Sequence, residues 1–168
     1  MRYFPLTLLA LFLMSTAAQA GEPQSDTHVT ETEKAMVVGI SPMMDAEGYF
    51  GTFLWAGPMW GKEISKKVWL MANPYGKFSP DSGYWGLGVT TTFEWMLGEY
   101  VGIDLLFEVG HEQHLDDFRG ASVGLGAGPG ITFYPCDSLF VGLYGTVNWN
   151  LMEMSANANP GLALGFTL

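Results

Sequence analysis

The chain has 168 residues, of which 48% are hydrophobic, 14% aromatic and 14% charged, and it carries a net charge of −10. Nucleic-acid binding depends on Lys and Arg contacts to phosphate, so this acidic balance argues against a nucleic-acid partner. Cys136 is the only cysteine, which excludes an intramolecular disulfide and a multi-cysteine metal site.

The first twenty residues have the pattern of a secretory signal peptide. Arg2 supplies the positive charge, residues 6–14 form an apolar stretch, and residues 18–20 (Ala-Gln-Ala) are a small-x-small cleavage site. The apolar stretch is much shorter than the roughly 20 residues that a spanning helix needs. We therefore expect export with cleavage after Ala20, and then a disordered, acidic leader over residues 21–34.

Eight candidate strands follow this leader. They cover residues 35–44, 48–57, 66–75, 83–95, 100–110, 120–134, 139–150 and 158–168. The alternation is clear in residues 100–110, where Ile103 and Leu105 share one parity, and Asp104 and Glu108 share the other. Because successive strand side chains point to opposite faces, such a strand has one apolar face and one face of polar residues and glycine. Residues 48–57 are apolar on both parities, so their faces are not assigned.

These strands predict an all-β fold, an eight-stranded antiparallel up-and-down transmembrane β-barrel over residues 35–168. Strands can cross lipid only as a closed barrel, because every backbone group must be paired internally. An even strand number places both termini at one end, with turns there at residues 58–65, 96–99 and 135–138. The loops of the other end would be residues 45–47, 76–82, 111–119 and 151–157. A secreted soluble β-sandwich that acts as a binding protein is the competing fold.

Two local features add to the strand pattern. Residues 133–142 (Phe-Tyr-Pro-Cys-Asp-Ser-Leu-Phe-Val-Gly) form an aromatic-turn-aromatic hairpin, and residues 159–166 (Asn-Pro-Gly-Leu-Ala-Leu-Gly-Phe) have the order polar-x-Gly-x-x-apolar-x-aromatic. With these features the chain resembles the small eight-stranded outer-membrane barrels of Gram-negative bacteria, the OmpA/OmpX-type architecture. The resemblance implies an outer-membrane location, contacts with the lipid bilayer and lipopolysaccharide, and recognition by the barrel assembly machinery.

Candidate ligand-binding residues lie on the inward parity. Glu94, Asp104 and Glu108 would share the lumen of neighbouring strands, where buried carboxylates need partners. Glycine is frequent on this face, at positions 86, 88, 102, 110, 124, 126, 128, 130 and 142. These glycines could leave a cavity beside the carboxylates, or they could relieve crowding by large inward residues such as Tyr84, Tyr100, Phe140 and Tyr144.

A second candidate site is the predicted outer loop that begins at His111. His111, His114 and Asp116 are metal-ligand types in one short segment, although the i, i+3 histidine spacing is not that of the helical zinc-protease motif. A solvated polar loop explains the same residues.

An enzyme of the lipid A deacylase type is the alternative function. Residues 153–161 (Glu-Met-Ser-Ala-Asn-Ala-Asn-Pro-Gly) faintly resemble the His-x-Ser-Asn segment of these enzymes, with Glu153 where the histidine should stand. Without that base Ser155 has no local activator, so we expect no catalytic residues and no cofactor. The prediction is a barrel with a structural, interaction or small-ligand-binding role. It is not a diffusion porin, because aqueous channels need 16 or more strands.

Overall fold

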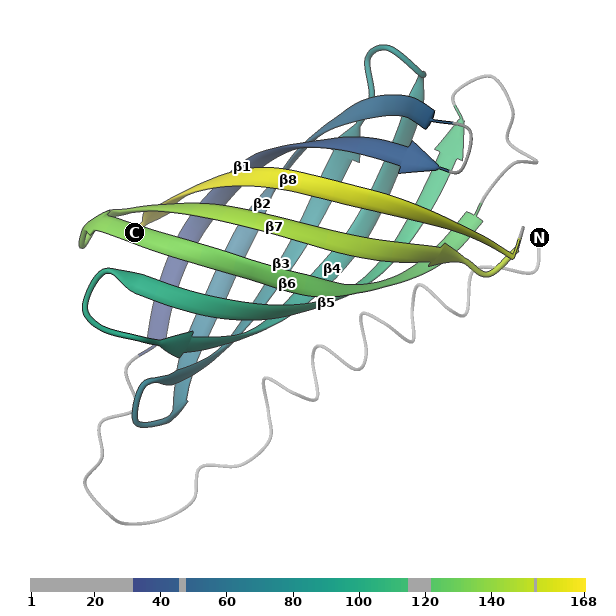
Figure 1. The fold of residues 1–168 in the computed structure, drawn as a ribbon. Coiled ribbons are helices and arrows are strands. Elements are labelled where there is room, and N and C mark those ends of the chain that lie inside the picture. The colour runs from purple at the N-terminus through teal and green to yellow at the C-terminus, as the bar shows by residue number, and fades with distance from the viewer. Residues whose placement is uncertain (1–31, 46–47, 115–121, 153) are drawn as a thin grey trace.

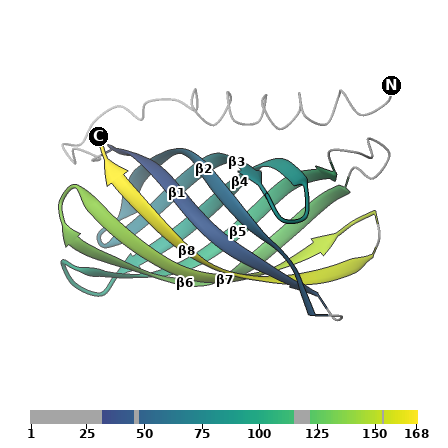
Figure 2. The ribbon, with the colours of Figure 1, turned by 90° about the horizontal axis from the view of Figure 1, so that it is seen from above.

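A computed structural model describes residues 32–45, 48–114, 122–152 and 154–168. Eight antiparallel strands pair in chain order, and the first pairs with the last to close a barrel (Figures 1 and 2). The strands are β1 (Thr32–Asp45), β2 (Gly48–Ser65), β3 (Val68–Phe78), β4 (Tyr84–Met96), β5 (Val101–His114), β6 (Ser122–Cys136), β7 (Leu139–Asn150) and β8 (Ser155–Thr167). The all-β barrel predicted from the alternation is therefore confirmed. No helix in the described segments has the length and apolar character needed to cross a bilayer.

Several predicted boundaries are wrong, because strand pairing continues into segments that were read as connections. Residues 58–65 belong to β2, and the turn to β3 shrinks to two lysines, where Lys67 adopts a left-handed φ of 68°. β3 continues to Phe78, and β5 continues to His114. β8 begins at Ser155 instead of after Asn157, and residues 32–34 of the predicted leader are already in β1. The rest of the leader and the predicted signal peptide lie outside the described residues.

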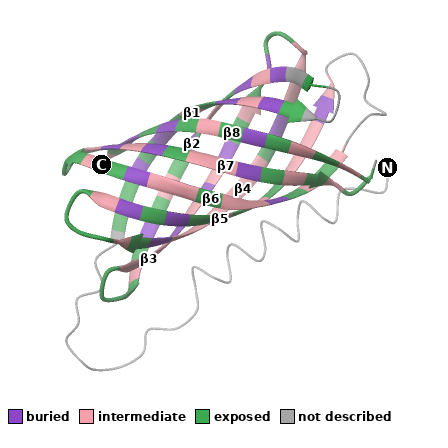
Figure 3. Ribbon diagram, viewed as in Figure 1, coloured by how far each residue is buried: buried purple, intermediate pink, exposed green. Residues whose placement is uncertain are grey.

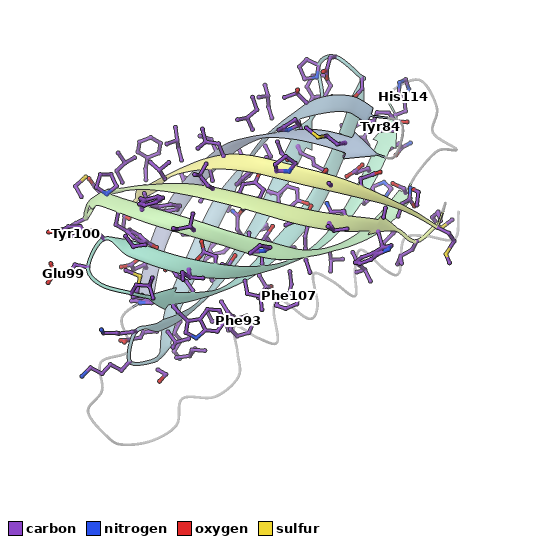
Figure 4. All side chains as sticks on the ribbon, viewed as in Figure 1. Tyr84, Phe93, Glu99, Tyr100, Phe107 and His114 are labelled. Carbon is purple, nitrogen blue, oxygen red and sulfur yellow. The ribbon has the colours of Figure 1, made fainter. Side chains whose placement is uncertain are left out.

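The connections divide the barrel into two ends. At the turn end, the hairpins β2–β3, β4–β5 and β6–β7 close with short turns, and the C-terminus lies beside them. The loop end carries the other four connections. Figure 4 shows Glu99 and Tyr100 at the turn end, and Tyr84 with His114 at the loop end.

The two parities face opposite sides of the wall, as the sequence predicts. Leu87, Ile103, Leu105 and Phe107 are 55%, 44%, 38% and 44% exposed on the outside, whereas Asp104 is only 7% exposed inside. Exposed and buried residues alternate along most strands (Figure 3), and Phe93 and Phe107 project from the outer wall (Figure 4). The faces of β2 are also settled, with Leu54 outside.

Several inward glycines lie beneath large side chains. A Cβ atom at Gly161 would overlap the ring of Tyr144, and one at Gly165 would overlap the ring of Phe140. Gly102 is covered by Glu94 in the same way. These three glycines therefore relieve crowding, whereas a Cβ atom at Gly124 or Gly142 would make only ordinary contacts. Tyr100, expected among the crowding residues, is instead 64% exposed in the β4–β5 turn.

Candidate functional site in the barrel lumen

Two adjacent carboxyl groups lie inside the barrel towards the turn end. Glu94 of β4 and Asp104 of β5 are opposite each other in the sheet register, and only 2% and 7% of their surface is exposed. The Tyr134 hydroxyl donates to both Glu94 oxygens at 2.8 Å. The Thr132 hydroxyl donates to Asp104 Oδ2 at 2.6 Å. Asp104 Oδ1 has no hydrogen-bond partner among the described residues.

An aromatic layer crosses the middle of the lumen. Trp55 of β2 donates its Nε1 hydrogen to the Tyr144 hydroxyl of β7 at 2.8 Å. The ring of Trp55 also makes edge contacts with Tyr75 and Tyr144, with centroids 6.0 and 6.1 Å apart. Because β2 and β7 are separated in the wall by β1 and β8, the contact between Trp55 and Tyr144 spans the interior.

The third predicted lumen carboxylate, Glu108, belongs to a separate network towards the loop end. It accepts hydrogen bonds from the Tyr75 hydroxyl and from Asn148 Nδ2. Lys77 lies 3.7 Å from Glu108 and also pairs with Glu112. The Lys77 side chain is 7% exposed. The prediction that Lys77 lies in a loop, away from the lumen carboxylates, is therefore wrong.

The strand extension of β3 explains that error. Tyr75 and Lys77 share a parity, so both point inward once β3 reaches Phe78. The sequence prediction ended this strand at residue 75 and placed Lys77 in a loop. Asn73, Tyr75 and Lys77 continue the inward parity of Met71, and that regular spacing was the available signal.

A cavity of about 110 Å³ lies in the lumen, and its lining includes residues of the carboxyl pair, the aromatic layer and the Glu108 network. Asp104, Glu108, Thr146 and Asn159 are among the residues that line it. Thr146 and Asn159 are opposite each other in the β7–β8 register and are 3% and 6% exposed. Thr146 Oγ1 and Asn159 Oδ1 have no hydrogen-bond partner among the described residues. The cavity has room for several water molecules or one small polar molecule, and it offers unsatisfied oxygen atoms to either.

The predicted metal site is not assembled among the described residues. His111 lies on the outer face of β5, with an edge contact to Trp85, whereas His114 lies on the inner face against Tyr84. Their odd separation in one strand sends them to opposite sides of the wall. Asp116 lies outside the described residues, and the described part of the chain contains no group of three metal-ligand residues.

The segment that resembles the deacylases is only partly described. Ser155 is the first residue of β8 at the loop end, and Glu153 lies outside the described residues. The exposed Cys136 ends β6 at the opposite end of the barrel, 3.6 Å from Ser138 Oγ. Neither feature touches the lumen site.

Three solved structures similar to this barrel are small outer-membrane barrels. Neisserial surface protein A is 10% identical with a TM-score of 0.53, covering 83% of this chain and 99% of its own. The N-terminal β-barrel domain of Pseudomonas aeruginosa OprF is 12% identical with a TM-score of 0.59, and the attachment invasion locus protein Ail of Yersinia pestis is 12% identical with a TM-score of 0.56. Both cover the same shares of the two chains, 83% and 99%. No family model and no curated protein matches the chain. The chain therefore has the fold of the small eight-stranded outer-membrane β-barrels, the OmpA/OmpX-type architecture.

Proposed function

We propose that this protein crosses the outer membrane of a Gram-negative bacterium as a closed barrel that does not conduct solutes. Its role is structural or interaction-based. The observation that carries the proposal is the apolar outer wall, on which Leu87, Val109 and Leu143 are 55%, 52% and 50% exposed. So large an exposed apolar surface marks an interaction site, and lipid covers a barrel wall on all sides.

The height of this wall matches a bilayer. Trp85 and Trp95 lie on the outer face of β4 and are ten residues apart. At about 3.3 Å per residue, and with a strand tilt of about 40°, this distance corresponds to about 25 Å along the barrel axis. An apolar band of about 25 Å between two aromatic girdles is typical of outer-membrane barrels. Trp149 near the loop end and Phe133 near the turn end extend the two girdles around the barrel.

The lumen contacts support a closed state. Trp55 and Tyr144 meet across the interior, and Lys77 with Glu108 and Glu112 occupies the space towards the loop end. An eight-stranded barrel is just wide enough to be filled by side chains. A lumen that side chains cross in this way leaves the two ends and the outer wall as the main interaction surfaces.

The biogenesis partners follow from the same proposal. The outward residues of β8 near the C-terminus, Leu162, Leu164 and Phe166, are 38%, 37% and 50% exposed and form the surface that the barrel assembly machinery would recognise. The loop-end half of the wall would contact the acyl chains of lipopolysaccharide. A cleaved signal peptide over residues 1–20 would direct export.

The test combines location, closure and conductance. We expect the protein in the outer-membrane fraction, with faster migration on a gel before boiling than after it. In planar bilayers we expect no steady conductance above that of empty membranes. Recovery of the protein as a soluble periplasmic species, with one gel mobility, would refute the membrane proposal. A stable open channel would refute the closed state alone.

A small-ligand role in the lumen is the second candidate, favoured by the unsatisfied oxygens of Asp104, Thr146 and Asn159 in the cavity. Carboxylate and carbonyl oxygens accept hydrogen bonds, so a small cationic donor fits them better than an anion. Methylammonium should raise the unfolding temperature of the detergent-folded protein more than sodium acetate does at equal ionic strength. The Asp104→Asn variant should lose this difference. Equal effects of the two salts on the unchanged protein would exclude the cationic site.

A further inference from the structure

Basic side chains are unevenly distributed over this acidic barrel. The described residues include five lysines and no arginine, and Lys77 is the one inside the lumen. The other four, Lys34, Lys62, Lys66 and Lys67, are all exposed at the turn end of β1, β2 and β3. A chain with a net charge of −10 thus has a local basic patch on β1, β2 and the turn between β2 and β3.

The patch continues the lipid-facing side of β2. Trp60, Lys62 and Ile64 follow one another on the outer parity towards the turn, and Trp60 and Ile64 are 45% and 50% exposed. Lys34 is opposite Trp60 in the β1–β2 register. Lys66 and Lys67 form the β2–β3 turn. An exposed Trp followed by lysines is the order expected where a protein surface passes from the hydrocarbon region into the headgroups.

The ammonium groups of the patch are available for a ligand. Both ion pairs recorded between described residues belong to Lys77. Glu63 approaches Lys67, but it accepts a hydrogen bond from the backbone N–H of Lys67, at 3.3 Å, and not from its ammonium group. The four exposed lysines on β1, β2 and the turn to β3 outnumber the two carboxylates of the same strand ends, Glu33 and Glu63, so the patch carries a net positive charge that an anionic surface can neutralise.

We propose that Lys34, Lys62, Lys66 and Lys67 form a binding site for the phosphate groups of anionic phospholipids in the leaflet at the turn end of the barrel. The inference rests on the proposed membrane-spanning function. Lysines near a membrane surface are attracted to anionic lipid headgroups. Phospholipid fits the site better than an acidic protein, because Trp60 and Ile64 place apolar surface for acyl chains on the same face as the lysines.

Native mass spectrometry of the detergent-folded protein tests this proposal, with phosphatidylglycerol and phosphatidylcholine of matched acyl chains as probes. We expect the Kd for phosphatidylglycerol to be at least about tenfold lower than the Kd for phosphatidylcholine, since several lysines act together. The preference should decrease as salt increases. Glycerol 3-phosphate, which has the phosphate without acyl chains, should not displace the bound lipid.

Two variants, each with all four lysines replaced, test whether the patch causes the preference for phosphatidylglycerol. Replacing the four lysines with Gln (Lys34→Gln, Lys62→Gln, Lys66→Gln, Lys67→Gln) should make the two Kd values equal, whereas replacing the same four with Arg should keep the preference. Equal Kd values for the unchanged protein would overturn the proposal. A preference that survives in the Gln variant, or complete displacement by glycerol 3-phosphate, would do the same. Heat-modifiable folding in phosphatidylcholine vesicles is scored separately. Its failure in the unchanged protein refutes the membrane function, whereas its success without a lipid preference refutes only the patch.

Discussion

Replacing Leu105 with arginine tests the lipid-facing wall directly. Leu105 is on the outer face of β5, 38% exposed, between Phe93 of β4 and Pro129 of β6 in the register. An arginine near the bilayer midplane costs about 2–4 kcal/mol of folding free energy in such barrels. This corresponds to a decrease of roughly 30-fold to 700-fold in the folding equilibrium constant, since about 1.4 kcal/mol is tenfold.

The depth dependence of this penalty provides the matched controls. Val101 lies four residues nearer the turn end on the same face of β5, which is about 10 Å closer to that membrane surface for a tilted strand. Val101→Arg should therefore cost only about 0–1 kcal/mol, the range for arginine near the interface. Ser122→Arg places the same side chain on the lumen parity opposite Glu112, where no lipid penalty applies.

The assay is reversible denaturant unfolding from phospholipid vesicles, followed by tryptophan fluorescence and by gel mobility without boiling. The expected order of destabilisation is Leu105→Arg first and Val101→Arg well behind. If Leu105→Arg and Val101→Arg destabilised the barrel equally, or if Leu105→Arg had no effect, β5 would not face lipid at this depth and the proposed membrane function would fail.

Three further substitutions test the interior. Trp55→Ala removes the contact with Tyr144, so it should destabilise the barrel by about 3–5 kcal/mol in the same unfolding assay and permit measurable conductance. If the variant barrel does not conduct, other side chains close the lumen. Lys77→Met should destabilise the barrel by about 3–5 kcal/mol, because it leaves Glu108 and Glu112 without their cation. Adding Glu112→Gln should restore part of the lost stability. If it restores none, the loss of the Lys77 ion pairs is not the cause of the destabilisation. Gly165→Ala should cost about 1–3 kcal/mol because a methyl group there overlaps the Phe140 ring, whereas Gly98→Ala, which meets no atom within 4 Å, should be neutral; equal unfolding midpoints for the two would contradict this packing.

The sequence was sufficient for the strand number and for the faces of β4 and β5. Period-two alternation identifies these faces, because one side meets an apolar medium and the other a polar interior. It also placed Glu94, Asp104 and Glu108 on the inner parity. These are properties of single strands, which local pattern can reveal.

The composition of the lumen layers could not be predicted in the same way. The contact between Trp55 and Tyr144 joins residues 89 positions apart, and it depends on the register of four strands around the barrel. The inward position of Lys77 was missed because Pro74 and Gly76 resemble a turn signal. In the barrel both residues stay in β3, where they pair with Val89 and Leu87 of β4. The pairing of Glu94 and Asp104 across β4 and β5 likewise follows from the register.

Closure between β1 and β8 has a consequence for how the chain must be made. Ala35 pairs with Thr167, and the Leu168 N–H donates to the carbonyl of Lys34 at 2.8 Å, so the seam joins the two ends of the described chain. Until β8 arrives, β1 and β7 both present rows of unpaired peptide groups that lipid cannot satisfy. Closure therefore needs β8, the last of the eight strands in chain order, so the barrel can close only after the chain has been made as far as Thr167. In the proposed membrane location, a chaperone or an insertase would have to protect both open edges until then.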